Sequence, residues 1–221
     1  MRKYINLLIL SSLFLFASCD KETEGISKIT YYTDLSLNGL DEMVVRVGGT
    51  YTEPGYVAIE NEVDVTDNVV VTGTVDATQL GAYTLVYSVK NKDGFAKSAE
   101  RLVLVVPAVT STIDLSGVYS GQRDGRALVA TGCTISMLST GVFKATDFFG
   151  GYYEFVAGYG SAYRLSAYFY LNEDNTYSAL STNSPWGPWG VINSVYAPAT
   201  KVLKHRVTQG TTGFNITLVK K

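Results

Sequence analysis

The sequence predicts an all-β protein built from two consecutive antiparallel units. Its 221 residues include 16 Tyr and 9 Phe, which favour strands, and 21 glycines, which supply turns. Charged residues make up only 17% of the chain, so the long polar residues that favour helices are scarce. Short apolar runs alternate with turn signals about every 8–12 residues, which is typical of β-sandwiches and β-barrels.

The N-terminal segment has the pattern of an export signal. Two basic residues precede an apolar run over residues 5–16, which is shorter than the roughly 20 residues of a membrane span. The small pair Ala17-Ser18 before Cys19 resembles a bacterial lipobox, in which the cysteine is acylated and becomes the first residue of the mature protein. We therefore predict a signal peptide over residues 1–18 and a lipid anchor on Cys19. An ordinary secreted protein cut near Ser18 is the alternative.

The residues that follow Cys19 indicate where the anchored protein lies. They read Asp20-Lys21-Glu22-Thr23-Glu24, within a tether over residues 19–26. A lysine followed by acidic residues resembles the short export signal of surface lipoproteins of the Bacteroidetes type. This resemblance implies the outer face of the outer membrane, with the membrane as a partner through the lipid anchor. A solvated charged tether without a targeting role is the alternative.

Residues 27–107 are predicted to form a β-sandwich. In the run over residues 83–89, strand alternation puts one set of apolar side chains on the same face. These are Tyr83, Leu85, Tyr87 and Val89. The sequence Asn-Lys-Asp-Gly at residues 91–94 predicts a hairpin turn. The nearly continuous apolar run over residues 101–106 predicts a strand that is covered on both faces.

The same unit resembles a bacterial Ig-like repeat over about residues 44–106. Residues 48–56 match its opening pattern Gly-x-x-Tyr-x-x-Pro-Gly, and residues 81–87 continue the match. Phe95 departs from the pattern, because the family usually has Asn there. The resemblance implies an Ig-like spacer and interaction module without catalysis of its own. We therefore expect this unit to give the protein reach from the membrane.

Residues 112–221 are predicted to form a second unit, an aromatic-rich antiparallel β domain that follows a short linker. Along residues 163–171 the apolar side chains again share one face, and the sequence Asn-Glu-Asp-Asn at residues 172–175 predicts a tight turn. Residues 201–207 and 214–219 predict a closing pair of strands. About seven or eight short strands joined by short turns indicate an antiparallel barrel or sandwich.

Charge and cysteine content exclude several function classes. Residues 27–107 carry 11 acidic and 6 basic side chains, whereas residues 112–221 carry 6 acidic and 9 basic side chains. Neither unit has a dense basic patch, so we expect no nucleic-acid partner. With Cys19 lipidated, Cys133 is the remaining thiol, which excludes an intramolecular disulfide and a cysteine metal cluster. We expect no cofactor.

Two aromatic loops in the second unit supply the candidate ligand-binding residues. Trp186 and Trp189 stand in a loop rich in Pro and Gly over residues 184–190, where flat apolar rings can stack on sugars. The other loop adds further aromatic rings and a carboxylate that can bind a sugar hydroxyl. Its candidates are Tyr152, Tyr153, Glu154 and Tyr159. The alternative is that the two tryptophans fold back and complete the core.

The sequence gives little support to catalysis. The hairpin turn explains the adjacent carboxylates Glu173-Asp174, and a glycosidase needs two carboxyl groups about 5–9.5 Å apart. His205 lies between two basic residues, so we expect it to be exposed. The chain has no nucleophile elbow, zinc-protease motif or phosphate-binding loop. Asp64 and Asp67 offer oxygen ligands to calcium, although acidic turns are more often only turns.

These observations predict a non-catalytic cell-surface lipoprotein. The opening Asp-Leu-Ser-Gly-x-Tyr of residues 114–119 and the segment 196–201 resemble C-terminal modules of two-domain lipoproteins from Bacteroidetes glycan-utilisation loci. That resemblance implies a protein that binds a polysaccharide or oligosaccharide, or that assists an outer-membrane uptake system. The alternative is a structural or protein-interaction lipoprotein, similar to an adhesin.

Overall fold

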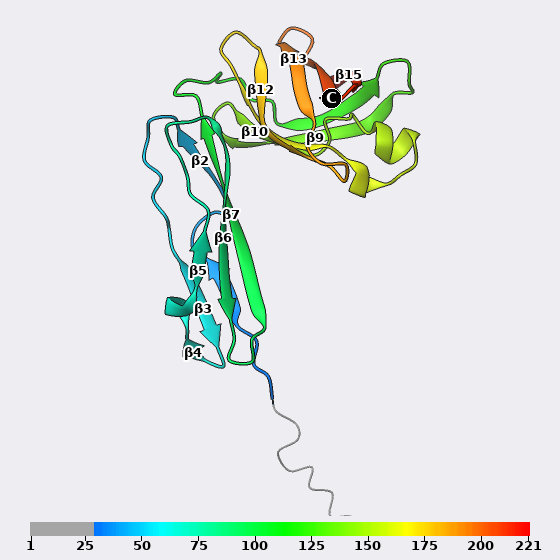
Figure 1. Cartoon of the computed structure of the whole chain (residues 1–221). Helices are drawn as coiled ribbons and strands as arrows, with labels where there is room; N and C mark the ends of the chain where they lie inside the picture. Colours follow the sequence, from blue (N-terminus) through cyan, green and yellow to red (C-terminus); the bar gives the residue numbers. More distant parts are fainter. Residues whose placement is uncertain (1–28) are drawn as a thin grey trace, which may run out of the picture.

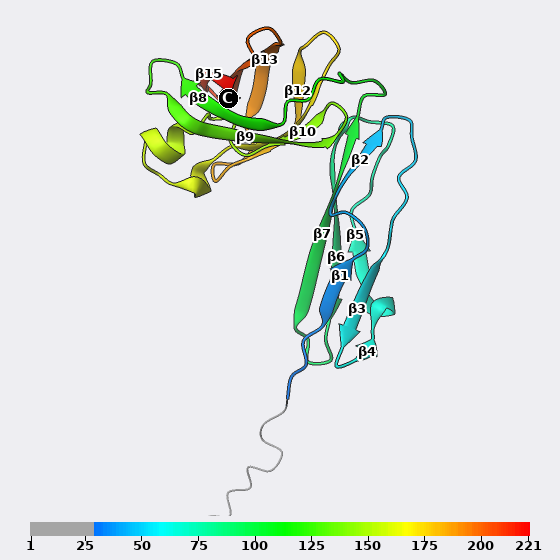
Figure 2. The same cartoon turned by 180° about the vertical axis from the view of Figure 1, so that it is seen from behind.

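The computed structural model describes residues 29–221. An elongated N-terminal unit carries the C-terminal unit across one of its ends (Figure 1), and the described chain begins at the opposite end (Figure 2). The predicted signal peptide, the lipidation site Cys19 and the tether over residues 19–26 lie outside the described residues. Within residues 29–221, no helix has the length and apolar character needed to span a membrane.

Two sheets form the N-terminal unit. The first is antiparallel and has the order β1 (Asp34–Leu37), β3 (Tyr56–Glu60), β4 (Val63–Asp64). The second has the order β2 (Glu42–Arg46), β7 (Ala96–Val106), β6 (Gly81–Lys90), β5 (Val70–Thr72). In this second sheet β2 runs parallel to β7, and the other neighbours are antiparallel. A 3₁₀ turn, η2 (Thr66–Asn68), precedes β5.

The core of the N-terminal unit lies between these sheets. Leu35 and Ala58 come from the first sheet, and Leu85, Tyr87 and Val89 come from β6. The predicted alternation along residues 83–89 is confirmed from Leu85 onward, whereas Tyr83 on the same face is only half-buried. The predicted hairpin over residues 91–94 connects β6 to β7.

A buried arginine links the loops of the N-terminal unit. Arg101 in β7 is fully buried, and its guanidinium donates to the carbonyl oxygens of Leu40 (2.7 Å), Asn38 (2.9 Å) and Gly55 (3.2 Å). It also lies 3.2 Å from a carboxylate oxygen of Glu53. A buried charge requires such partners, so Arg101 fixes the β1–β2 connection against the turn that precedes β3.

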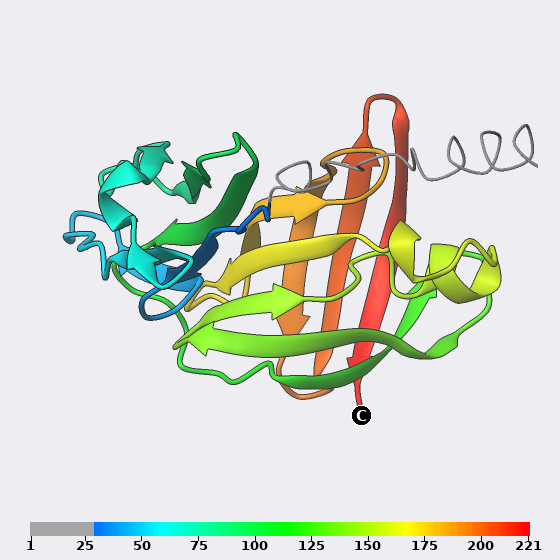
Figure 3. The ribbon, with the colours of Figure 1, turned by 90° about the horizontal axis from the view of Figure 1, so that it is seen from below.

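The C-terminal unit is one antiparallel sheet of eight strands that curls into a near-closed barrel (Figure 3). Its order is β12 (Tyr177–Asn183), β11 (Ser166–Leu171), β10 (Val142–Ala145), β9 (Val129–Ser139), β8 (Gly117–Arg123), β15 (Thr212–Lys220), β14 (Val202–Gln209), β13 (Gly190–Ala197). Edge strands β12 and β13 face each other, and an isolated bridge between Thr176 and Val195 joins them at one end. The all-β prediction is confirmed, and a barrel is the correct choice for the second unit.

Aromatic rings fill much of the barrel. Phe148 contacts Phe169 at a centroid distance of 5.1 Å and Tyr177 at 6.2 Å, while Phe143 lies 5.4 Å from Phe169. The predicted apolar face of residues 163–171 points into this core from residue 165 onward. Its fully buried members are Leu165, Ala167, Phe169 and Leu171. The predicted turn over residues 172–175 connects β11 to β12, with Asn175 in the left-handed region at φ 64°.

The prediction that His205 is exposed is wrong. In β14 the side chain of His205 lies on the inner face with Leu203 and Val207, and it is 2% exposed. Strand alternation turns its two basic neighbours away from the core, so their charge gave no information about the residue between them. The sequence also gave no prediction of strand β13, because a positive-φ residue, Asn193, and a register shift interrupt its alternation.

The two units meet where strands β2, β6 and β7 of the Ig-like unit pack against strands β9 to β12 of the barrel. Apolar residues Leu104 and Val106 of β7 pack with Val142 and Tyr170 of the barrel. This packing confirms that the apolar run over residues 101–106 is covered on both faces. Polar contacts surround it: Glu42 bonds to Lys144 and Tyr168, and Arg46 donates to Thr110 Oγ1 (2.9 Å) and to the carbonyl oxygen of Thr140 (2.9 Å).

Candidate functional site

The loop between β10 and β11 is organised by a buried carboxylate. Asp147 Oδ1 accepts hydrogen bonds from the backbone N–H groups of Phe149 (2.8 Å) and Leu165 (2.9 Å), and Oδ2 accepts one from Gly151 (3.0 Å). Burial raises the pKa of Asp147 to about 6, and the three N–H bonds oppose that rise. Asp147 thereby joins the beginning of this loop to its end.

Close backbone packing holds the same loop against the barrel wall. Gly150 and Gly151 have φ values of 65° and 79°, which favour glycine. A Cβ at Gly121 of β8 would lie 2.3 Å from the Gly150 carbonyl oxygen, and a Cβ at Gly132 of β9 would lie 2.4 Å from it. Strands β8 and β9 therefore need glycine where the loop touches them. The loop continues into a π-helical turn, η3 (Tyr152–Val156), and a 3₁₀ turn, η4 (Ser161–Tyr163).

This loop meets the β12–β13 loop in a group of aromatic rings. The Trp186 ring centroid lies 4.7 Å from that of Tyr153, 5.1 Å from Tyr163 and 6.4 Å from Tyr159. Trp186 is 40% exposed and Tyr159 is 55% exposed, whereas Tyr153 and Tyr163 are half-buried. We call these four residues the aromatic face. Three of the predicted candidates, Trp186, Tyr153 and Tyr159, are thus brought together, with Tyr163 as an additional member.

Trp189 does not belong to the aromatic face. Its side chain is 7% exposed and packs in the barrel at centroid distances of 5.1 Å from Phe149 and 5.8 Å from Phe214. The hypothesis that both tryptophans form one exposed surface is therefore corrected, because Trp189 enters the core just before β13 begins. The core alternative holds for Trp189, and Trp186 stays at the surface.

Tyr152 lies at the margin of the aromatic face. Its ring is 4.9 Å from that of Tyr153, and the Arg123 guanidinium lies 4.5 Å from the Tyr152 ring centroid. The same guanidinium lies 3.9 Å from the ring centroid of Phe214. Cation–π contacts of this kind stabilise an aromatic side chain in one position. Tyr152 therefore supports the site from one side, and Arg123 covers part of its ring.

Glu154 forms a two-bond ion pair with Arg164. Arg164 Nε donates to Glu154 Oε2 and Arg164 Nη2 donates to Glu154 Oε1, each at 2.6 Å. Paired bonds between a guanidinium and a carboxylate are among the stronger charge-assisted contacts. The predicted role of Glu154 as a free acceptor for a sugar hydroxyl is therefore modified, since both of its oxygens already accept bonds from Arg164.

A polar groove of about 440 Å³ lies beside the aromatic face. Two of its lining residues flank Tyr163 in the sequence, and a third directly precedes Trp186. The lining residues are Thr146, Ser161, Ala162, Arg164, Ser166, Asn183, Ser184 and Pro185. Ser184 Oγ donates to the carbonyl oxygen of Gly187 (2.8 Å) and so fixes the turn that carries Trp186. Apolar rings next to convergent polar groups are typical of ligand sites.

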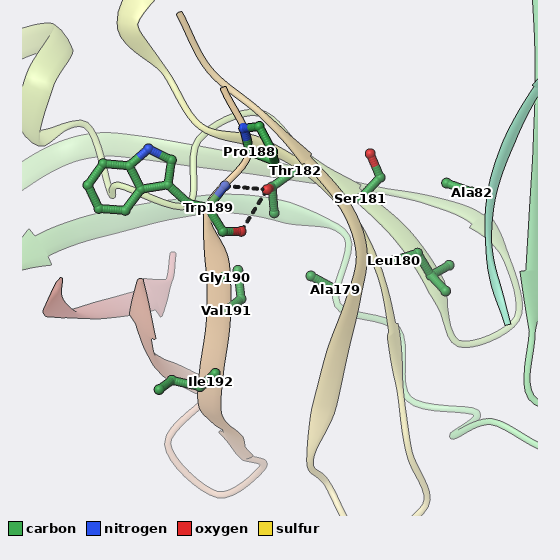
Figure 4. Close-up of a pocket in the computed structure, with 10 residues that line it drawn as sticks. All are labelled: Ala82, Ala179, Leu180, Ser181, Thr182, Pro188, Trp189, Gly190, Val191 and Ile192. Carbon is green, nitrogen blue, oxygen red and sulfur yellow. Dashed lines mark hydrogen bonds between the residues drawn. The ribbon is translucent and has the colours of Figure 1, made fainter. Parts of the chain in front are cut away.

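A second groove, of about 550 Å³, marks the seam where the barrel does not close (Figure 4). It lies between β12 and β13, and its described lining residues carry no charge. Thr182 Oγ1 accepts a bond from Trp189 N–H (2.9 Å) and donates to the Trp189 carbonyl oxygen (2.7 Å) across the seam. In Figure 4 the indole of Trp189 points away from Ala82 and Leu180. This groove offers few directional groups to a ligand, so we centre the candidate site on the aromatic face.

His205 and Cys133 are titratable groups buried inside the barrel, where they contribute to its packing and hydrogen bonding. His205 Nε2 lies 2.8 Å from the Phe148 carbonyl oxygen, which can only accept, so the proton is on Nε2 and Nδ1 accepts from the Tyr177 hydroxyl (2.8 Å). Burial lowers the pKa of His205 to about 4. Burial also raises the pKa of the Cys133 thiol to about 12, as expected for a buried strand cysteine. Within residues 29–221 no group of three or more His, Cys, Asp or Glu side chains could hold a metal ion.

Comparison with known proteins finds a matching family model for each of the two units. A family model described as a bacterial surface protein Ig-like domain matches residues 35–105, and a model for a C-terminal domain matches residues 109–220. The crystal structure of the lipoprotein BT2262 from Bacteroides thetaiotaomicron matches with 34% sequence identity and a TM-score of 0.50. This match covers 86% of the present chain and 100% of that protein. The chain belongs to the family of this lipoprotein. The predicted resemblance to an Ig-like surface lipoprotein of Bacteroidetes type is confirmed.

Two weaker likenesses involve domains of ZmpB from Clostridium perfringens. A structure of its M60 catalytic domain with CBM51-1 and CBM51-2 has 13% identity and a TM-score of 0.31, covering 87% of this chain and 21% of that one. A structure of CBM51-2 in complex with GlcNAc and of INT domains has 16% identity and a TM-score of 0.31, covering 85% and 43%. We draw no conclusion from likenesses at this level. The search of curated proteins found no match.

Sequence reasoning missed three residues that build the site. Asp147 follows a short strand and precedes two phenylalanines, and the only signal was a lone acidic residue within an apolar segment. The alternating pattern predicts a strand that includes Tyr163 and Arg164, but β11 begins at Ser166 and both residues belong to the loop between β10 and β11. A carboxylate that precedes a Gly-Gly pair by three residues was the clue that could have identified Asp147 as an acceptor for loop N–H groups.

Proposed function

We propose that this protein is a non-catalytic lipoprotein of the outer membrane that faces the cell exterior and binds glycan through its barrel. The observation that carries the glycan proposal is the aromatic face: four packed rings, two of them substantially exposed, next to a polar groove. Aromatic rings offer apolar surfaces to the C–H faces of sugars, and neighbouring polar groups bond to hydroxyls. Assistance to a polysaccharide uptake system is part of the same proposal.

The arrangement of the two units supports a barrel held away from the membrane. The described chain starts at the end of the Ig-like unit farthest from the barrel, so an anchor on Cys19 would leave the barrel directed away from the lipid (Figures 1 and 2). Membership in a lipoprotein family supports the anchor. We expect Cys19→Ala to move the protein from the membrane fraction to the soluble fraction, because the acyl chains are lost. Protease added to intact cells should remove the wild-type protein, and full protection would place it inside the cell envelope.

The glycan proposal is tested by affinity electrophoresis against a panel of polysaccharides. We expect the wild type to be retarded by at least one of them, and Trp186→Ala to lose that retardation with little change in melting temperature. Phe95→Ala is the matched control, since Phe95 is 52% exposed on the Ig-like unit, far from the barrel loops in the sequence. Retardation of the wild type by no polysaccharide, or equal loss in both variants, contradicts the proposal and favours a protein-interaction role.

A further inference from the structure

The charge balance of the polar groove distinguishes classes of glycan. Among the described residues that line it, Arg164 alone carries a charge, and the Glu154 carboxylate pairs with its guanidinium through two bonds of 2.6 Å. Glu154 is well buried, with 11% of its side chain exposed, whereas 38% of the Arg164 side chain is exposed. The pair carries no net charge, and Arg164 presents the positive end to the groove while Glu154, which does not line it, holds the balancing negative charge.

The remaining polar groups of the groove are uncharged. Ser161 and Asn183 are exposed there, and Ser166 donates to the Asn183 carbonyl oxygen (3.4 Å). A hydroxyl both donates and accepts, and an amide offers both functions at fixed positions. Such groups match the hydroxyls of an uncharged sugar, each of which also donates and accepts. The groove volume of about 440 Å³ falls within the usual range of small-ligand sites.

From these contacts we infer that the polar groove selects uncharged sugars and disfavours acidic ones; this inference rests on the proposed glycan binding. One sugar stacks on Trp186, and the next places its hydroxyls against Asn183, Ser161 and the free edge of Arg164. A uronate carboxylate in the groove would compete with Glu154 for the same guanidinium. The repulsion between the two carboxylates then disfavours the acidic chain, because like charges at close range are costly in a partly desolvated site.

The test compares Glu154→Gln with the wild type on two sets of probes. Dextran, mannan and β-glucan are the uncharged set, and polygalacturonate and hyaluronan are the acidic set. Glutamine keeps the shape and an acceptor for Arg164 but leaves its positive charge unbalanced. We expect the wild type to bind an uncharged probe without salt dependence, and Glu154→Gln to bind an acidic probe about tenfold more tightly than the wild type at low salt.

Two variants complete the design. Glu173→Gln is the control, because it makes the same change in net charge on the exposed β11–β12 turn. Asn183→Ala should weaken binding of the uncharged probe without lowering the melting temperature. Salt-dependent binding of acidic probes by the wild type overturns the inference while leaving glycan binding intact, and so does equal behaviour of Glu154→Gln and Glu173→Gln. If the wild type binds neither set, both the proposed function and the inference fail.

Discussion

The Ig-like unit and the barrel each bury one charged side chain that organises loops, but the two charges support different structures. Arg101 donates to three backbone carbonyl oxygens and contacts Glu53, and it joins connections within the Ig-like unit. Asp147 accepts from three backbone N–H groups, and it orders a loop that carries exposed aromatic rings. In both units, a buried charge bonded to backbone groups fixes the loops. In the Ig-like unit these loops belong to the predicted spacer, and in the barrel they carry the candidate binding surface.

Substitution of Asp147 and of Arg101 should give the largest difference between the two units in glycan binding. Asp147→Ala leaves three buried N–H groups without acceptors, at about 1–3 kcal/mol each, so we expect a loss of about 4 kcal/mol or more in the free energy of unfolding. Retardation of the protein by polysaccharide should also be lost in Asp147→Ala, because the loop that carries the aromatic face is no longer ordered. Arg101→Met should also destabilise the protein, but the molecules that remain folded should keep their glycan retention. Chemical denaturation and affinity electrophoresis measure the two quantities, and loss of retention in Arg101→Met would break the comparison.

The two tryptophans give the next largest contrast. Trp189→Ala removes a buried ring that contacts Phe149 and Phe214, and we expect a loss of about 3–5 kcal/mol in the free energy of unfolding. Trp186→Ala removes a ring that is 40% exposed, and its cost should be smaller by several fold. Urea denaturation of both variants measures the difference. Equal destabilisation would show that Trp186 is also a core residue and would remove the aromatic face as a binding surface.

The pH dependence of stability should reveal Asp147 and His205 as opposing groups. The folded protein holds the His205 pKa near 4, below its ordinary 6.5, so the unfolded chain takes up that proton first and acidification through this window destabilises the fold. The folded protein holds the Asp147 pKa near 6, above its ordinary 3.8, so acidification through that window favours the fold. In the wild type the two contributions partly cancel.

Substitution of Asp147 should make the effect of His205 on the pH dependence of stability measurable. Asp147→Asn should lose stability more steeply than the wild type as the pH falls from about 6.5 to about 4, because Asp147 then no longer opposes the His205 contribution. Melting curves across this range give the slopes. A slope in Asp147→Asn that is equal to or shallower than that of the wild type would contradict the assigned environment of Asp147.

The regular strands of both units could be predicted from the sequence, and the site could be predicted only in part. Period-two patterns located the buried faces around Leu85 and Phe169, and Asn- and Gly-rich segments located the turns. The loop after β10 lacks a period, since its shape depends on long-range bonds from Asp147 to Leu165 and on contact with Gly121 and Gly132. Local sequence does not encode such contacts.

For Trp186, Trp189 and His205 too, local sequence does not determine which side chain is buried. Trp186 and Trp189 stand three residues apart in one loop with similar neighbours, yet one is at the surface and the other in the core. Composition cannot distinguish them, because the difference depends on where β13 begins and on the Thr182 bonds that hold Trp189 at the seam. For His205, the two charged neighbours predict an exposed side chain, whereas the strand period places it on the inner face with Leu203 and Val207.

The most direct test of glycan binding by the aromatic face uses tryptophan fluorescence. Trp189→Phe keeps a ring in the core and leaves Trp186 as the sole tryptophan, whereas Trp186→Phe leaves Trp189 as the sole one. With a polysaccharide that retards the wild type, we predict that the ligand protects Trp186 from acrylamide quenching and leaves the already buried Trp189 unchanged. Binding by the Trp189→Phe variant without any change in the quenching of Trp186 would contradict the account.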